Sequence, residues 1–107
     1  MAWFAIRSVY HFSTKPDGTN VFEERIVCFE APTQVEAHEK AYVEREAYAN
    51  ENGFTAHRQQ IGYEQDGDPL IDGYEIWSCM FESRDTLDTF YAKRYDQFQY
   101  KVPDEAT

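Results

Sequence analysis

Four carboxylates that gather in the second half of the sequence are the residues best placed to do chemistry. They are Glu64, Asp66, Asp68 and Asp72. Carboxylate oxygens two residues apart on a loop can bind Ca²⁺ or Mg²⁺. However, the apolar residues at 69–71 stand where a calcium-binding loop needs further ligands and a glycine. We therefore expect a solvated loop over Gln65–Gly73 whose charges face a protein partner, and no metal site.

The histidines and cysteines form no known catalytic or metal-binding motif. His11, His38 and His57 lie on three different predicted elements, and neither an H-E-x-x-H nor a C-x-x-C pattern occurs. Cys28 and Cys79 each lie in an apolar, strand-like run, which predicts buried free thiols and not a reactive nucleophile. A glycine-rich phosphate loop and a G-x-S-x-G motif are also missing from the sequence. We therefore expect no enzyme activity and no cofactor.

A series of aromatic residues near the C-terminus indicates a different kind of site. Its members are Phe90, Tyr91, Tyr95, Phe98 and Tyr100. On a helix these side chains point in several directions, so they cannot all face one core. Exposed tyrosines beside carboxylates are typical of protein-binding surfaces, where aromatic side chains anchor the partner and charges steer it. We expect Tyr91 and Tyr95 to be such anchors.

Charge and composition narrow the class of partner. The chain has 107 residues, with 20 acidic and 10 basic side chains and a formal net charge of −10. Nucleic acids and anionic membrane surfaces are bound through Lys and Arg, so both are disfavoured as partners, whereas a basic protein fits. The length and the 42% hydrophobic content predict one domain over residues 1–107. No signal peptide or membrane-spanning stretch is visible, which favours a cytoplasmic protein.

The first half of the chain predicts a long antiparallel hairpin. Trp3–Phe12 and Val21–Ala31 have strand-like patterns, and Lys15–Gly18 contains the Pro-Asp-Gly residues of a tight turn. Alternation places one set of residues of the first strand on a common face toward the core. These are Phe4, Ile6, Ser8, Tyr10 and Phe12.

A helix is predicted to follow the hairpin. Thr33 and Glu36 form a capping box at its start, and Gly53 supplies a left-handed cap after Asn52. Its inner stripe is predicted to contain two small and two aromatic residues. These are Ala37, Ala41, Tyr48 and Tyr42.

The second half predicts two more strands and a second helix. Thr55–Glu64 is polar and resembles an edge strand, whereas Tyr74–Phe81 is apolar on both faces and is predicted to be a central strand. Ser83 is predicted to cap a helix that carries Tyr91 and Tyr95. The expected fold is α+β: an antiparallel sheet of about four strands with two helices, in the order β-β-α-β-β-α.

Three short segments resemble a family of small, uncharacterised bacterial domains that begin with a Trp-aromatic strand. The segments are Trp3–Arg7, Phe22–Val27 and Glu75–Ser78. That resemblance implies a hairpin, a helix and further strands, and it carries no catalytic residues. In size, acidity and lack of catalytic motifs the chain is also similar to immunity proteins of contact-dependent inhibition and polymorphic toxin systems.

The leading hypothesis from the sequence is therefore a non-enzymatic immunity protein that occludes a basic bacterial toxin, such as a nuclease. One alternative is a ligand-binding domain or small enzyme with a pocket between sheet and helices, lined by Tyr10, Tyr74 and Trp77. Another alternative is a homodimer that pairs through the polar Thr55–Glu64 edge.

Overall fold

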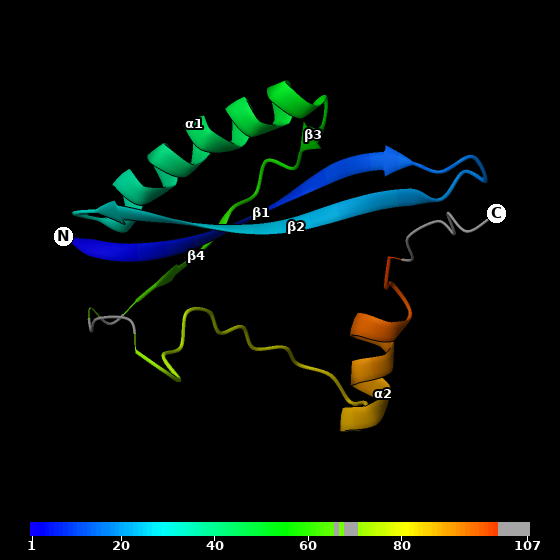
Figure 1. The fold of residues 1–107 in the computed structure, drawn as a ribbon. Helices are drawn as coiled ribbons and strands as arrows, with labels where there is room; N and C mark the ends of the chain where they lie inside the picture. The colour runs from blue at the N-terminus through cyan, green and yellow to red at the C-terminus, as the bar shows by residue number, and fades with distance from the viewer. Residues whose placement is uncertain (66, 68–70, 101–107) are drawn as a thin grey trace.

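A four-stranded antiparallel sheet with one long helix on one face forms the body of the computed structural model, which describes residues 1–65, 67 and 71–100. The elements are β1 (Ala2–Thr14), β2 (Asn20–Ala31), α1 (Gln34–Asn52), β3 (Thr55–Ala56), β4 (Ile61–Glu64), α2 (Leu87–Tyr91) and the wider-turned η1 (Ala92–Asp96). β1 is central: β2 pairs with one edge, and β3 and β4 share the other. Figure 1 shows α1 above this sheet and α2 below it. The predicted α+β class and antiparallel sheet are confirmed.

The predicted hairpin forms because its turn satisfies the backbone locally. The Gly18 N–H donates to Lys15 O at 2.9 Å, and the Thr19 N–H donates to the Asp17 carboxylate at 2.9 Å. Gly18 has φ of 90°, a conformation that residues with a Cβ rarely adopt. β1 and β2 then pair along almost their whole length, from Ala2 opposite Ala31 to Thr14 opposite Asn20.

The caps of α1 are also those that the sequence predicts. Thr33 Oγ1 accepts the Glu36 N–H at 3.2 Å, and Gly53, with φ of 73°, donates its N–H to Ala49 O. These bonds satisfy backbone groups that the ends of a helix leave free. The predicted start and end of this helix are therefore confirmed.

Small side chains let α1 lie close against the sheet. Ala37, Ala41 and Ala49 are buried, and the sheet residues beneath the helix include fully buried aromatic and aliphatic side chains, Phe4, Ile6 and Tyr10. Tyr48 is half-buried against Tyr10, with ring centroids 5.1 Å apart. The prediction that Tyr42 belongs to this inner stripe is wrong, because its side chain is 54% exposed and Arg45 takes the buried position instead.

Three further predictions are wrong. Tyr74–Phe81 forms no strand: it pairs with no strand of the described residues and meets the sheet through side chains, such as the Trp77 ring on Tyr63. Cys28 and Cys79 are exposed, since the first lies on the sheet face without α1 and the second lies in the unpaired segment. Ser83 accepts a hydrogen bond from the Asp85 N–H but does not cap the helix. α2 begins at Leu87, and its N-cap is Thr86, whose hydroxyl accepts the Thr89 N–H.

Substitution of Ala41 by Leu tests the close approach of α1 to the sheet. Ala41 is 3% exposed, so the larger side chain must displace its neighbours, and we expect the free energy of unfolding to fall by about 1–3 kcal/mol. Urea denaturation measures this change. Ala47→Leu is the matched control, because Ala47 lies on the exposed side of the same helix. Equal effects of the two substitutions would contradict the packing described here.

Candidate functional site

The sheet face opposite α1, called the second face below, carries the largest set of exposed apolar side chains on regular structure. It is made by alternate residues of β1 and β2, which the register places opposite one another. These residues are Trp3, Ala5, Arg7, Val9, His11, Phe22, Glu24, Ile26, Cys28 and Glu30. Phe22, near the hairpin turn, is 63% exposed, and Ile26, in the middle of β2, is 43% exposed. Among the described residues, α2 and η1 lie on this side of the sheet but do not pack closely against it as α1 does on the other face.

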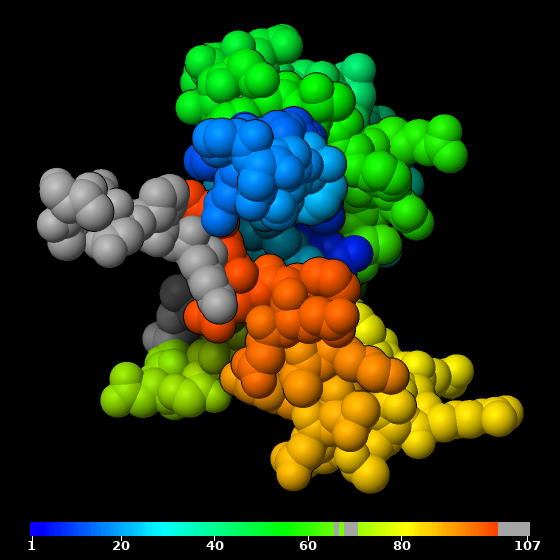
Figure 2. Space-filling view, turned by 90° about the vertical axis from the view of Figure 1, so that its right-hand side faces the viewer, coloured from blue at the N-terminus to red at the C-terminus, as the bar shows by residue number. Residues whose placement is uncertain are grey.

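The segment from Asp72 to Tyr100 crosses the second face at only a few points. Trp77 packs against Tyr63 with ring centroids 6.0 Å apart, and Arg94 forms an ion pair of 3.6 Å with Glu24. Near the hairpin turn, the Lys15 ammonium lies 5.1 Å from the ring centroid of Tyr100. Figure 2 shows this end of the molecule, with the hairpin turn in blue between α1 and the orange residues of α2 and η1.

Between these contacts the segment and the sheet enclose a groove of about 1130 Å³. Its lining combines three cations and two carboxylates with several aromatic and aliphatic side chains. The cations are Arg7, Lys15 and Arg94, the carboxylates are Glu24 and Asp96, and the large apolar residues include Phe22, Ile26, Trp77, Tyr91 and Tyr95. Concave sites that combine apolar walls with convergent polar groups are typical binding sites for small molecules and for protruding side chains of a partner.

Arg7 lies on the sheet side of this groove with an unsatisfied donor. Its Nε is buried and has no hydrogen-bond partner among the described residues, and no ion pair to its guanidinium is present there. A buried donor left without an acceptor costs about 1–3 kcal/mol. An acceptor brought by a bound molecule would remove this cost, so Arg7 favours binding in the groove.

The structure places Tyr91 and Tyr95 together at the groove. Their rings lie 5.0 Å apart, and the Arg94 guanidinium lies 5.3 Å from the Tyr95 ring. Tyr91 is 54% exposed and Tyr95 is 49% exposed, so each keeps a free ring surface. This pair can act as a flat aromatic anchor for a partner.

Two of the four predicted acidic residues, Glu64 and Asp72, lie among the described residues. Glu64 ends β4, is exposed, and pairs with Phe4 near the start of β1 on the helix-covered side of the sheet. Asp72 is exposed in a turn, while Asp66 and Asp68 lie outside the described residues. In Figure 1 the end of β4 and α2 lie toward opposite ends of the sheet. Glu64 and the two tyrosines therefore do not form one contact site.

The aromatic pocket proposed from Tyr10, Tyr74 and Trp77 does not form. Tyr10 is 1% exposed and lies under α1, whereas Trp77 packs against the second face. The sheet separates these two side chains. Sequence reasoning also missed Arg7, and only its place opposite the core residues of β1 signals a position on the other face.

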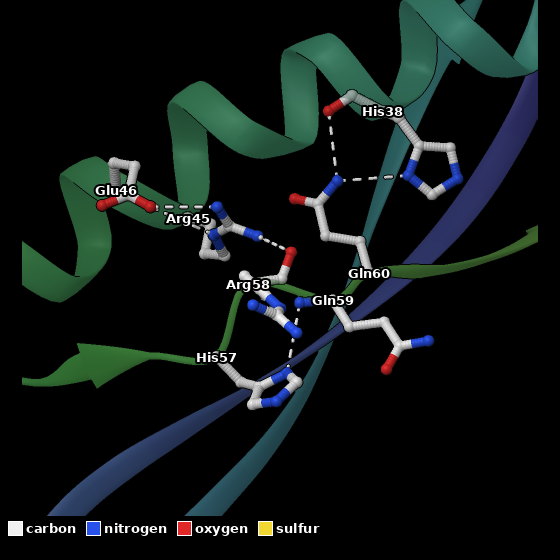
Figure 3. A network of polar contacts seen from close by, with 7 residues as sticks. All are labelled: His38, Arg45, Glu46, His57, Arg58, Gln59 and Gln60. Carbon is white, nitrogen blue, oxygen red and sulfur yellow. Dashed lines mark hydrogen bonds and ion pairs between the residues drawn. The ribbon is translucent and has the colours of Figure 1, made fainter.

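A polar network fixes the connection between β3 and β4 to α1 (Figure 3). Arg45, which is 4% exposed, donates from Nη1 to Arg58 O at 3.1 Å, and its Nη2 contacts Glu46 Oε1 at 3.0 Å. Gln60 Nε2 donates to His38 O at 3.2 Å. These bonds turn the backbone toward the helix and interrupt the single strand predicted over Thr55–Glu64. The network lies on the helix-covered face and serves the fold.

No cluster of three His, Cys, Asp or Glu side chains able to hold a metal ion is present among residues 1–65, 67 and 71–100. The three histidines have separate hydrogen-bonded environments: His11 contacts Asn20, His38 contacts Gln60, and His57 Nδ1 accepts the Gln59 N–H. None of the described helices is both long and apolar enough to cross a membrane. Comparison of the chain with protein-family models, curated proteins and solved structures gave no match.

Tyr48 provides a pH-dependent test of the packing of α1 on β2. Its hydroxyl donates to Glu23 Oε1 at 2.6 Å, and this bond, followed by burial, raises the pKa of Tyr48 above its usual value of 10.0. The bond therefore stabilises the fold fully below the pKa of an unfolded tyrosine, and that contribution is lost as the pH rises through the folded value. We expect nuclear magnetic resonance of the tyrosine ring carbons to show the raised pKa, and Glu23→Gln to lower it. If the titration midpoint of Tyr48 were the same in Glu23→Gln, the bond to Glu23 would not be the cause of the raised pKa.

Proposed function

We propose that this protein is a non-enzymatic binding domain that receives another protein on its second face. The observation that carries this proposal is the exposure of Phe22 and Ile26 on β2, beside the half-exposed Tyr91 and Tyr95. A soluble monomer rarely leaves a large contiguous apolar patch uncovered. Aromatic side chains at the centre of such a patch supply most of the binding free energy in protein interfaces.

The charge of the chain supports a basic partner. The net charge of −10 produces a field that attracts cationic proteins and accelerates their association. Glu64 and Asp72 lie away from the aromatic pair and act in this proposal through long-range attraction, not through contact. Glu24 and Asp96 are closer to the groove and would face the partner's basic groups.

In its narrower form, the proposal is that the protein neutralises a basic bacterial toxin, such as a nuclease, by covering its active site. Its support is the acidity of a small chain whose sequence contains none of the catalytic motifs named above. Occlusion requires affinity and speed of association but no chemistry, and an acidic surface around an aromatic patch supplies both.

A small anionic ligand in the groove is a second candidate, which the unpartnered Arg7 favours. An Arg guanidinium binds carboxylate or phosphate groups through two parallel hydrogen bonds. The aromatic walls at Trp77 and Tyr91 would hold a flat apolar part of the same ligand. Titration of the free protein with aromatic carboxylates and phosphates distinguishes this candidate from protein binding.

Matched tyrosine substitutions test where the partner binds. The probe is the purified product of the gene adjacent to that of this protein, titrated by calorimetry. We expect Tyr91→Ala to weaken binding at least tenfold, a loss of about 1.4 kcal/mol, because the substitution removes an anchor from the second face. Tyr42→Ala is the control: both tyrosines are 54% exposed, but Tyr42 lies on α1 at the opposite side of the sheet. Equal losses in both variants, or no binding by the unmodified protein, would contradict the proposal.

Replacement of Arg7 by Met separates binding from stability. It removes an unsatisfied buried donor, so we expect the free energy of unfolding to rise by about 1 kcal/mol in urea denaturation. The same substitution should weaken binding in the groove, because the bound molecule loses its guanidinium contact. A less stable Arg7→Met protein would mean that Arg7 already has an internal acceptor.

A further inference from the structure

No strand among the described residues pairs with the outer edge of β2, which α1 contacts near its end at Glu30. β2 lies at the end of the sheet, where it pairs with β1 alone among the described strands. It has 12 residues, Asn20–Ala31, and is much longer than β3 or β4 at the opposite edge. Long open edges pair readily with strands of other chains, so proteins usually cover or interrupt them.

The register identifies which backbone groups point outward. Trp3 O accepts the Gln65 N–H at 2.9 Å, and Val9 O accepts the His57 N–H at 2.8 Å. These β1 carbonyls therefore point away from β2, and their opposite residues Glu30 and Glu24 must point to the free edge. By alternation, the outward N–H and C=O groups belong to Phe22, Glu24, Ile26, Cys28 and Glu30. One of these carbonyls is occupied, since Lys40 Nζ donates to Glu30 O at 2.7 Å.

We propose that two copies of this chain pair antiparallel through β2, with Ile26 on the two-fold axis. This register places Ile26 opposite Ile26, Glu24 opposite Cys28, and Glu23 opposite Phe29 of the second copy. No like charges then face each other directly. Three neighbouring registers oppose like charges: centring on Glu24 or Arg25 opposes that residue to itself, and centring on Val27 opposes Glu24 to Glu30. Centring on Cys28 avoids like charges but overlaps only residues 25–31 of β2, whereas centring on Ile26 overlaps residues 21–31.

The pairing provides hydrogen-bond partners for the outward backbone N–H and C=O groups of β2 that pair with no strand in the isolated chain. The pairs formed by Glu24, Ile26 and Cys28 with the second copy exchange two hydrogen bonds each, roughly six in all. The two sheets join into one, and the second faces of both copies become continuous. Pairing occurs at the edge of the sheet and partner binding on its face, so dimerisation and the proposed function fail separately.

Net charge determines how the dimer responds to salt. Each copy carries −10, so the two copies repel each other at long range, and added salt screens that repulsion. We expect dimerisation to strengthen as the ionic strength rises. Pairing of the same edge with a strand of a basic protein would weaken with salt.

Sedimentation and cross-linking of the full chain test the proposal. We expect the unmodified protein to sediment as a dimer and Ile26→Lys, at a position 43% exposed, to fold but dimerise at least tenfold more weakly. In a Cys28→Ser, Cys79→Ser background, Ile26→Cys should form a disulfide between copies, because hydrogen-bonded antiparallel pairs have Cα atoms about 5.5 Å apart. Phe22→Cys in that background is the control, since its two copies would lie eight residues apart along the strand, roughly 27 Å.

Three results would overturn the proposal. The first is a monomer at every protein and salt concentration. The second is a dimer in which Phe22→Cys cross-links as efficiently as Ile26→Cys, which would require another register or another interface. The third is an Ile26→Lys protein that folds, as circular dichroism reports, and dimerises as tightly as the unmodified chain.

Discussion

The close packing of α1 against one face of the sheet is the interaction on which the rest of the structure depends. Ala37 and Ala41 have no side chain beyond Cβ, so the helix approaches Phe4 and Ile6 closely enough to exclude water. This contact buries nearly all of the large side chains that the described residues bury completely. The hydrophobic stabilisation of the fold is therefore concentrated in one layer between helix and hairpin.

Because α1 covers only one face of the sheet, the second face is available to contact another molecule. The Cα radius of gyration is 16.8 Å, whereas a compact domain of about 100 residues has roughly 13 Å. The difference reflects residues such as Met80, which is 93% exposed, in a segment that touches the sheet at few points. An apolar face, an open strand edge and an unsatisfied Arg7 are three separate deficits of the isolated chain. The apolar face and Arg7 lie on the side of the sheet away from α1, and association with other chains would relieve all three deficits.

Local signals allowed the first half of the fold to be predicted, and non-local pairing limited the second half. The turn at Lys15–Gly18 and the caps at Thr33 and Gly53 are determined by residues near in sequence, and the structure contains all of them. The alternation in Tyr74–Phe81 identifies a segment able to form a strand, but it does not say whether a neighbouring edge is free. The burial of Cys28 likewise depends on which face a helix covers, and alternation alone assigns no such preference.

The same contrast between local signals and non-local pairing holds for the residues of the candidate site. The exposure of Tyr91 and Tyr95 could be predicted because aromatic residues at helical spacing cannot all reach one core, and both side chains lie beside the groove. Alternation places Arg7 opposite the core residues of β1, but only the position of α1 shows that its face of the sheet is the uncovered one. The sequence predicts long-range steering by Glu64 and Asp72, and this role requires no contact with the tyrosines.

The central claim is that the second face receives another protein, and hydroxyl-radical footprinting of the complex tests it most directly. The method reports the solvent exposure of individual aromatic side chains in the protein alone and bound to the purified product of the adjacent gene. The account predicts that Phe22, Tyr91 and Tyr95 become protected while Tyr42 on α1 stays reactive. Protection of Tyr42 with continued reactivity of Phe22 and Tyr91 would contradict the account.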